Sequence, residues 1–133
     1  MRALVTSVVA VGFMLVVGLG ARAAAQRDPE AAKLQNPVAS NTDSLADGKR
    51  AYQRFCANCH GSNAQGGPGN DLTPPAPDLT LKELKHGSTD GEIFTVIKNG
   101  TPPDFNMVAW GAQGLQDQDI WKIVNYLRTL TKK

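Results

Sequence analysis

The stretch Cys56-Ala57-Asn58-Cys59-His60 decides how this sequence is interpreted. It places two thiols three positions apart and an imidazole directly after the second thiol. These are the only two cysteines in 133 residues, so they cannot form a framework of disulfides that joins distant loops. Their chemistry is therefore expected to be local.

Several kinds of local site compete for this motif. A zinc site needs further ligands, and the chain has only one other histidine, His86. A thioredoxin-like pair would follow a strand in a βαβ unit, and a plain disulfide leaves His60 without a role. Thiols at this spacing can both form thioethers with the vinyl groups of a haem, and the next residue then offers its imidazole to the iron. We therefore predict one covalently attached haem c, bound through Cys56 and Cys59, with His60 as an axial ligand.

An uncharged run of 19 residues, 3–21, lies between Arg2 and Arg22 and is followed by alanines. This pattern predicts an export signal peptide over residues 1–25. A membrane-spanning helix needs about 20 apolar residues, so an uncleaved membrane anchor through residues 3–21 remains open. On both interpretations the rest of the chain lies outside the cytoplasmic membrane, and we expect a periplasmic location.

The exported part of the chain carries no net charge. Two of the 14 basic residues lie in the leader, which leaves 12 basic and 12 acidic residues. A neutral chain lacks the electrostatic attraction that nucleic acid requires, so no nucleic-acid partner is expected. Residues 26–43 contain Pro29 and Pro37 and no sustained apolar period, which predicts a linker before one domain over residues 44–133.

Apolar residues that recur at intervals of three and four predict two helices. The first set runs into Cys56 and comprises Leu45, Gly48, Tyr52 and Phe55. The second set lies near the C-terminus and comprises Ile120, Val124, Leu127 and either Leu130 or Thr131. Acidic residues at the start of the second helix and basic residues at its end suit the helix dipole.

A threonine three residues before a glutamate has the spacing of a capping box. This pattern occurs at Thr80 and Glu83 and again at Thr89 and Glu92, and each pair predicts the start of a short helix. Gly87 and Gly100 are placed to end these helices. No segment predicts a strand, so the predicted fold class is all-α, with about four short helices.

Two long stretches, 61–79 and 100–116, resist assignment to a helix or strand. The first holds four glycines and four prolines in 19 positions. A small domain with two such loops buries too little apolar surface unless another group contributes to the core. A haem would provide that contribution.

The sequence resembles the class I c-type cytochromes over about residues 44–130. The resemblance rests on Gly48 and Tyr52 ahead of the motif, the run CANCHG, the proline-rich loop, and a C-terminal helix with Trp121 and Tyr126-Leu127. It implies the class I cytochrome c fold, in which short helices surround one haem. The segments GSTDGEIF and DIWKIVNYLRTL are similar to small monohaem domains that accompany bacterial respiratory oxidases and periplasmic quinoprotein dehydrogenases.

Met107 is the candidate for the second axial ligand. Met1 and Met14 lie in the leader, so Met107 is the only thioether in the exported part. The resemblance also places an axial methionine in the long loop before the last helix, although it implies a proline where Val108 stands. His86 is the alternative ligand, but its position beside Gly87 favours a solvated or helix-capping role.

A histidine that binds a metal needs a fixed acceptor for its other ring nitrogen. The resemblance implies that this acceptor is a proline carbonyl shortly after the motif. Pro77 is the candidate, with Pro74 and Pro75 as weaker ones.

These predictions converge on a single-electron carrier without enzyme activity, since His60 and Met107 would fill both axial positions of the iron. The expected partners are redox proteins: a donor dehydrogenase or quinol-linked complex, and an acceptor oxidase or cytochrome. The chain would act as a monomer or a complex subunit in a periplasmic respiratory or dehydrogenase-linked chain. Two alternatives remain open: a haem subunit of a larger oxidase or dehydrogenase, and a five-coordinate haem sensor or peroxidase.

Overall fold

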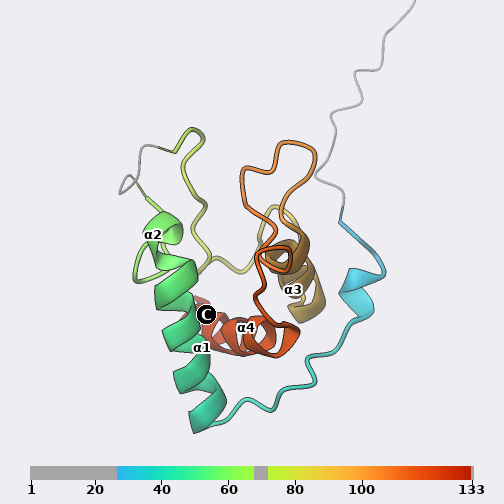
Figure 1. Cartoon of the computed structure of the whole chain (residues 1–133), viewed down its shortest axis with the longest axis vertical. Helices are drawn as coiled ribbons and strands as arrows, with labels where there is room; N and C mark the ends of the chain where they lie inside the picture. Colours follow the sequence, from blue (N-terminus) through green and yellow to red (C-terminus); the bar gives the residue numbers. More distant parts are fainter. Residues whose placement is uncertain (1–26, 68–71, 133) are drawn as a thin grey trace, which may run out of the picture.

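The computed structural model describes residues 27–67 and 72–132, and all regular structure within these residues is helical (Figure 1). The prediction of an all-α fold is confirmed. The elements are the 3-10 helix η1 (Ala31–Lys33) and the α-helices α1 (Thr42–Phe55), α2 (Ala57–His60), α3 (Asp90–Asn99) and α4 (Asp117–Leu130). The predicted signal peptide or anchor lies outside the described residues. None of the helices in the described part is long and apolar enough to cross a membrane.

The centre of the fold is the crossing of α1 and α4 (Figure 1). A β carbon on Gly48 would collide with the backbone carbonyl of Lys122, so the two helices approach more closely than any larger residue would allow. The largest fully buried side chains lie on these two helices: Tyr52, Ile120, Ile123 and Val124. The apolar faces predicted from sequence periodicity are therefore the faces that the helices bury.

Helix α1 begins two residues before the predicted domain boundary at Ser44. Asn41 caps it: its side chain accepts a hydrogen bond from the Ser44 N–H at 2.9 Å, and the Ser44 hydroxyl accepts one from the Asn41 N–H at 3.0 Å. This capping box satisfies two backbone donors at the helix start. The pattern of a threonine three residues before a glutamate did not predict this cap, because asparagine and serine form it.

The capping box predicted at Thr89 and Glu92 is present at the start of α3. The Thr89 hydroxyl accepts a hydrogen bond from the Glu92 N–H at 3.2 Å, and the Glu92 carboxylate accepts one from the Thr89 N–H at 2.9 Å. Gly100 ends the helix with a φ of 71°, a left-handed conformation that favours glycine. This short helix is therefore predicted correctly at both ends.

The helix predicted at Thr80 is wrong. Residues 80–87 form turns and bends, and Gly87 ends no helix. Both the N–H and the hydroxyl of Thr80 donate to the carboxylate of Asp78, at 2.8 and 2.6 Å. Because an aspartate two residues upstream engages both groups, the Thr80 hydroxyl is not used to cap a helix.

Residues 27–41, predicted as a loosely packed linker, contact the helices along much of their length. Ala31 in η1 is buried, and a β carbon on Gly91 of α3 would collide with its carbonyl oxygen. Asn36 donates to Asn125 of α4 at 2.9 Å, and Asn125 donates to the Val38 carbonyl at 3.0 Å. Part of this contact is made by asparagine side chains, which leave no apolar period in the sequence.

Candidate functional site

The two cysteines and the histidine of the motif lie where α1 passes into α2. Cys56 ends α1, and its carbonyl accepts hydrogen bonds from the N–H groups of Cys59 and His60 at 3.1 and 2.9 Å. Residues three and four apart on a helical turn are neighbours, so the turn groups Cys56, Cys59 and His60. Both thiols are free, with Cys56 buried and Cys59 half-buried.

The environment of Cys56 does not suit a reactive redox thiol. Burial, and secondarily the nearby Cys59, raises the pKa of Cys56 to about 12. A catalytic or redox-active cysteine needs a lowered pKa and access to solvent. This site therefore gives no support to the thioredoxin-like alternative.

His60 is only 7% exposed, and its ring has one hydrogen-bonding neighbour in the described part of the chain. Its Nδ1 lies 3.3 Å from the carbonyl oxygen of Pro77. A carbonyl can only accept, so Nδ1 carries the proton and Nε2 has the lone pair. Burial lowers the pKa of His60, although the Pro77 carbonyl acts in the opposite direction. The side chain is thus a neutral imidazole with a fixed ring and an available Nε2.

The loop after the motif brings Pro77 to His60. The N–H of Gly66 donates to the His60 carbonyl at 2.9 Å, and the N–H of Leu79 donates to the carbonyl of buried Ala64 at 2.7 Å. A β carbon on Gly66, which has a φ of 67°, would collide with the backbone at Ala76 and Pro77. The glycine therefore lets the two halves of the loop pack backbone to backbone.

Tyr52 of α1 is hydrogen-bonded to Gly61, the first residue after the motif. Its side chain is completely buried, and its hydroxyl donates to the Gly61 carbonyl at 2.7 Å. Burial raises the pKa of the Tyr52 phenol, so it stays protonated and keeps its role as a donor. Tyr52 also packs against Tyr126 of α4, with ring centroids 5.5 Å apart. The tyrosine thus connects the helix crossing to the site.

Met107 is half-buried against the core and lies in the loop between α3 and α4. Its backbone is clamped by Thr101: the Met107 N–H donates to the Thr101 hydroxyl at 3.0 Å, and the Thr101 N–H donates to the Met107 carbonyl at 3.2 Å. A β carbon on Gly100 would collide with that same carbonyl. No hydrogen bond or ring contact joins the Met107 side chain to the motif within the described residues.

An aromatic pair nevertheless joins the surroundings of Met107 to those of the motif. Phe55, next to Cys56, and Trp110, three residues after Met107, have ring centroids 5.5 Å apart. Figure 1 shows the described parts of the loops 61–79 and 100–116 on the same side of α4. The two long irregular stretches of the sequence are therefore neighbours of one site.

The structure separates His86 from the motif. His86 is half-buried in the turn before α3 and lines a groove of about 1050 Å³ whose other walls include Arg27, Glu92 and Pro103. Neither His60 nor Met107 lines that groove. Burial, and secondarily Lys85, lowers the pKa of His86. The predicted helix-capping role is wrong, because residues 80–87 form no helix to cap.

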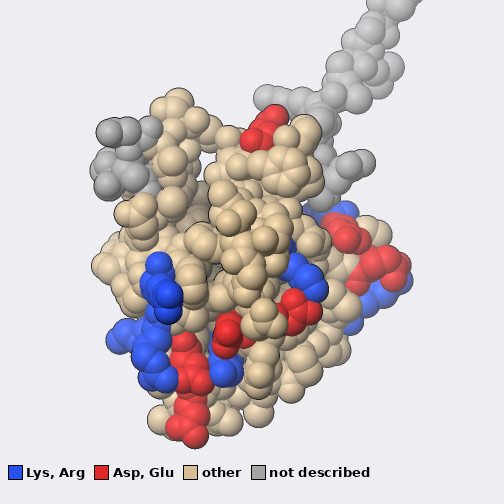
Figure 2. Space-filling model, in the orientation of Figure 1, with Lys and Arg blue, Asp and Glu red and all other residues tan. Residues whose placement is uncertain are grey.

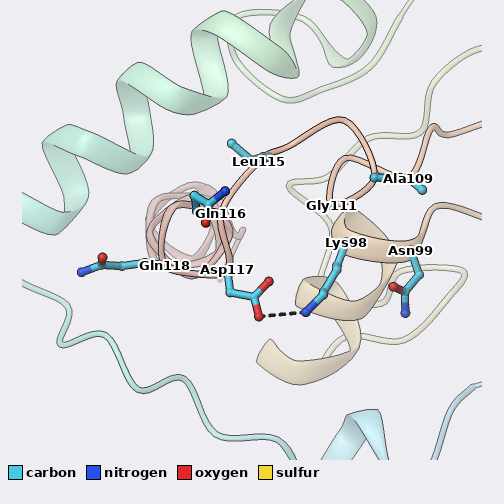
Figure 3. A pocket seen from close by; sticks show the side chains of 9 residues that line it. Lys98, Asn99, Ala109, Gly111, Leu115, Gln116, Asp117 and Gln118 are labelled. Atoms are coloured by element: carbon cyan, nitrogen blue, oxygen red, sulfur yellow. Dashed lines mark hydrogen bonds and ion pairs between the residues drawn. The ribbon is translucent and has the colours of Figure 1, made fainter.

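A second groove, of about 760 Å³, lies between the end of α3 and the start of α4 (Figure 3). The ion pair between Lys98 Nζ and Asp117 Oδ2, at 2.8 Å, crosses it. None of the predicted site residues lines this groove. The described residues also contain no group of three or more histidine, cysteine or acidic side chains that could hold a metal ion.

Comparison with known proteins identifies the family. Residues 43–127 match the family described as cytochrome C oxidase, cbb3-type, subunit III. The chain is a class I c-type cytochrome. It is 34% identical over 89 residues to cytochrome c-554(547) of Halothiobacillus neapolitanus, covering 64% of the chain and 94% of that relative. It is 29% identical over 94 residues to the cbb3-type cytochrome c oxidase subunit CcoP of Rubrivivax gelatinosus, covering 71% of the chain but only 28% of that subunit.

Solved structures support the cytochrome c fold. Cytochrome CL of Methylophaga aminisulfidivorans superposes with a TM-score of 0.54 at 22% identity, covering 68% of this cytochrome and 57% of that chain. A chain of the reducing HAO-like protein complex of Kuenenia stuttgartiensis superposes with a TM-score of 0.60 at 23% identity, covering 76% and 49%. At these identities the likeness concerns the fold alone.

The family implies a covalently bound haem c, and the residues present fit that group. Two free thiols lie beside a buried neutral imidazole whose Nε2 has no hydrogen-bond partner among the described residues. A buried ring nitrogen without a hydrogen bond suits a metal ligand. The cytochrome is thus an electron carrier or a haem subunit of a larger complex.

Three residues that shape the site were not predicted: Gly66, Thr101 and Trp110. Gly66 had a local signal, because paired glycines in a proline-rich loop mark tight turns. Thr101 and Trp110 act through contacts with residues six positions away or on another element. A single sequence gives no signal for such contacts.

Proposed function

We propose that this cytochrome is a single-electron carrier of a periplasmic respiratory or dehydrogenase-linked chain. One haem c would be attached through Cys56 and Cys59, with His60 and Met107 as the axial ligands. Pro77 would hold the His60 ring through its carbonyl oxygen. An export signal or anchor would occupy residues 1–25, and residues 26–43 would connect it to the domain over residues 44–133. Within that connecting segment, residues 27–41 pack on the helices and α1 already begins at Thr42.

The observation that carries this proposal is the environment of His60. The ring is buried, Nδ1 faces the Pro77 carbonyl at 3.3 Å, and Nε2 has no hydrogen-bond partner among the described residues. An acceptor on one ring nitrogen fixes the tautomer and increases the basicity of the other. This arrangement supports iron ligation more specifically than the motif alone does.

Met107 has the properties expected of the second ligand. It is the only methionine in the described residues, its side chain is half-buried, and both backbone hydrogen-bonding groups are clamped by Thr101. A clamped backbone limits the movement of the thioether away from a partner. A methionine and histidine pair raises the reduction potential, as suits a carrier late in an electron-transfer chain.

The haem supplies the one-electron chemistry, and the chain supplies its environment. The buried aromatic and aliphatic side chains around Tyr52 and Phe55 provide a low dielectric. Pro77 and Thr101 restrain the two ligands, so little movement is needed when the charge changes. With His60 and Met107 both bound to the iron, no position would remain for a substrate, which supports a carrier rather than an enzyme.

A second candidate is a haem subunit of a larger oxidase complex. It is favoured by the matches to CcoP subunits, of which this chain spans less than a third: 28% for Rubrivivax gelatinosus and 30% for Azospirillum brasilense. The match to cytochrome c-554(547) over 94% of its length favours the small carrier instead. Size determination of the native protein in a mild detergent separates the two, since the carrier migrates alone.

The proposed function is tested by the spectrum and redox titration of the holoprotein. We expect a low-spin ferric state at neutral pH and a reversible one-electron transition. A high-spin ferric state at neutral pH would overturn the assignment of a carrier, because it would reveal an open coordination position. That result would favour the sensor or peroxidase alternative.

A further inference from the structure

Phe105 is unusual in both its exposure and its backbone conformation. Its side chain is 53% exposed, the largest exposed fraction among the large hydrophobic residues of the described chain. Its φ is 45°, in the left-handed region that a bulky residue rarely adopts. Such a conformation costs free energy and persists where the surrounding structure holds it, often at functional sites.

The loop that carries Phe105 is closed at its base. The Phe105 N–H donates to the Thr101 carbonyl at 2.8 Å, and Thr101 forms two hydrogen bonds with the backbone of Met107. Thr101 thus fixes the turn over residues 101–107 from both sides. The ring of Phe105 is therefore presented from a closed turn rather than from a freely moving tail.

The two long loops themselves carry almost no charged side chains. In residues 100–116 the only charged side chain is that of Asp104, and the described residues 61–67 and 72–77 contain none. Figure 2 shows the charged side chains gathered over the helices and the N-terminal segment, while the two loops are largely uncharged. Val108 and Leu72, on these two loops, are also exposed apolar residues.

We propose that Phe105 is a docking anchor that inserts into an apolar pocket on the surface of a redox partner protein. This inference rests on the proposed function, since it assigns the partner surface for the same site. Aromatic residues at the centre of an interface contribute most of its binding energy, and a central region depleted of charge is typical of interfaces. The anchor lies two residues from Met107, so docking here brings the partner close to the second ligand.

The charge around Phe105 favours a protein pocket over a lipid surface. Interfacial membrane binding by an aromatic residue is usually supported by lysines and arginines that attract anionic headgroups. No basic residue occurs in residues 100–116, and the charged residue next to Phe105 is Asp104. Arg27 and Lys85 are the basic residues that share a groove with Pro103 and Asp104. Asp28 and Glu92 line the same groove and Arg27 forms an ion pair with Glu83, so the described residues form no basic patch there. An uncharged, apolar protein surface is the complementary partner.

The backbone conformation allows a variant that removes the ring without weakening the fold. Asparagine tolerates left-handed φ values better than phenylalanine does, so Phe105→Asn keeps or increases stability. Phe105→Trp retains an aromatic anchor. Leu81→Asn is the matched control, because Leu81 is 47% exposed but lies in the turn before α3.

The test measures electron exchange between each reduced holoprotein and membranes or periplasmic extract from the organism that carries this chain. We expect Phe105→Asn to raise KM about tenfold, the effect of a single interface anchor, while Phe105→Trp and Leu81→Asn stay within about twofold of wild type. Direct oxidation by ferricyanide, with denaturant unfolding, checks that the site and the fold are intact in every variant. Vesicles of phosphatidylcholine and phosphatidylglycerol test the lipid alternative.

The KM values of the variants and their vesicle binding separate the possible outcomes. A KM for Phe105→Asn within about twofold of wild type would overturn the anchor, as would an equal increase for Leu81→Asn. Vesicle binding by wild type that is lost in Phe105→Asn would overturn the protein partner in favour of lipid. If wild-type holoprotein exchanges electrons with neither fraction, the proposed function itself fails, and the anchor role fails with it.

Discussion

At the scale of single residues, the site depends on how backbone groups hold two side chains. His60 is oriented by the Pro77 carbonyl, and Met107 is restrained through its backbone by Thr101. The proposed ligands are thus positioned by different means: a contact to the ring itself for histidine, and a clamp on the main chain for methionine. This difference makes the two assignments separately testable.

Replacing the proposed methionine ligand should change the potential. Met107→His introduces a stronger donor that stabilises the ferric state, so the midpoint potential should fall by on the order of 0.2 V, part of the roughly 0.8 V range that axial ligands span. His86→Ala is the control and should leave the potential nearly unchanged. Redox titration of the two holoproteins decides: a shift in His86→Ala alone would show that the ligand assignment is wrong.

Glu92 should make stability depend on pH. Hydrogen bonds from the Thr89 and Ser88 N–H groups hold the pKa of the Glu92 carboxyl below its ordinary value, although burial acts in the opposite direction. Because the pKa is lower in the folded protein, the ionised Glu92 carboxylate stabilises the fold at pH values above the pKa of an ordinary glutamate. This stabilisation is lost as the pH falls through the pKa of Glu92 in the folded protein. Wild type should therefore lose more stability than Glu92→Gln between about pH 6 and pH 3.

Urea unfolding of the two holoproteins across this pH range measures the effect. Glu83→Gln provides the control, because the Glu83 side chain is 78% exposed and caps no helix. Equal pH dependence in wild type and Glu92→Gln would contradict the role of Glu92 in the cap.

The residues proposed to hold the haem are the ones that the sequence marks most clearly. Cys56, Cys59 and His60 are marked by their spacing, and Pro77 was expected from the family resemblance. Gly66 had only the general turn signal of paired glycines, and Thr101 had none, because their contacts are with backbone that lies opposite them in the folded loops. These contacts exist only once the chain is folded.

At the scale of elements, the crossing of α1 and α4 carries the site on one side. Tyr52, buried in this crossing, donates to the Gly61 carbonyl directly after His60. A change in the distance between the two helices would therefore shift Tyr52 and, through its hydrogen bond to Gly61, the proposed ligand His60.

Gly48→Ala tests the close approach of α1 and α4. The added β carbon would collide with the Lys122 carbonyl, so the helices must separate, and the free energy of unfolding should fall by about 1–3 kcal/mol. Lys49→Ala, at the exposed neighbouring position, should change it by less than about 0.5 kcal/mol. Denaturant unfolding of both holoproteins gives the comparison, and equal stabilities would argue against close packing at Gly48.

Helices were predictable where local and tertiary signals agreed. The periodic faces of α1 and α4 and the capping box of α3 all pack as their sequences indicate. The pattern at Thr80 failed because Asp78 engages Thr80, and the Lys132 N–H donates to the Thr80 carbonyl at 2.8 Å. A competing side chain and a distant backbone group outweighed a local capping pattern.

At the scale of the whole molecule, charge is mixed over the helices and sparse on the loops (Figure 2). Many charged side chains are paired, including Lys98 with Asp117, Arg128 with Asp90 and Lys132 with Asp78. Pairing leaves little charge of one sign to attract a partner over a distance.

Electron transfer with the physiological partner should therefore depend weakly on salt. Without a strongly charged docking surface, the rate should change by only a few-fold between low and physiological ionic strength. Stopped-flow reduction across a salt series measures this dependence. A decrease by orders of magnitude would instead implicate cations without an ion-pair partner in the described residues, such as Lys49, Arg54, Lys82 and Lys85.

We propose that this chain holds one haem through Cys56 and Cys59. Intact-mass spectrometry under denaturing conditions, on protein produced with a c-type haem maturation system, measures that attachment. We expect the mass of the polypeptide plus one haem, and loss of that added mass in the Cys56→Ala, Cys59→Ala double variant. Wild-type protein at the mass of the bare polypeptide would show that no haem is covalently bound.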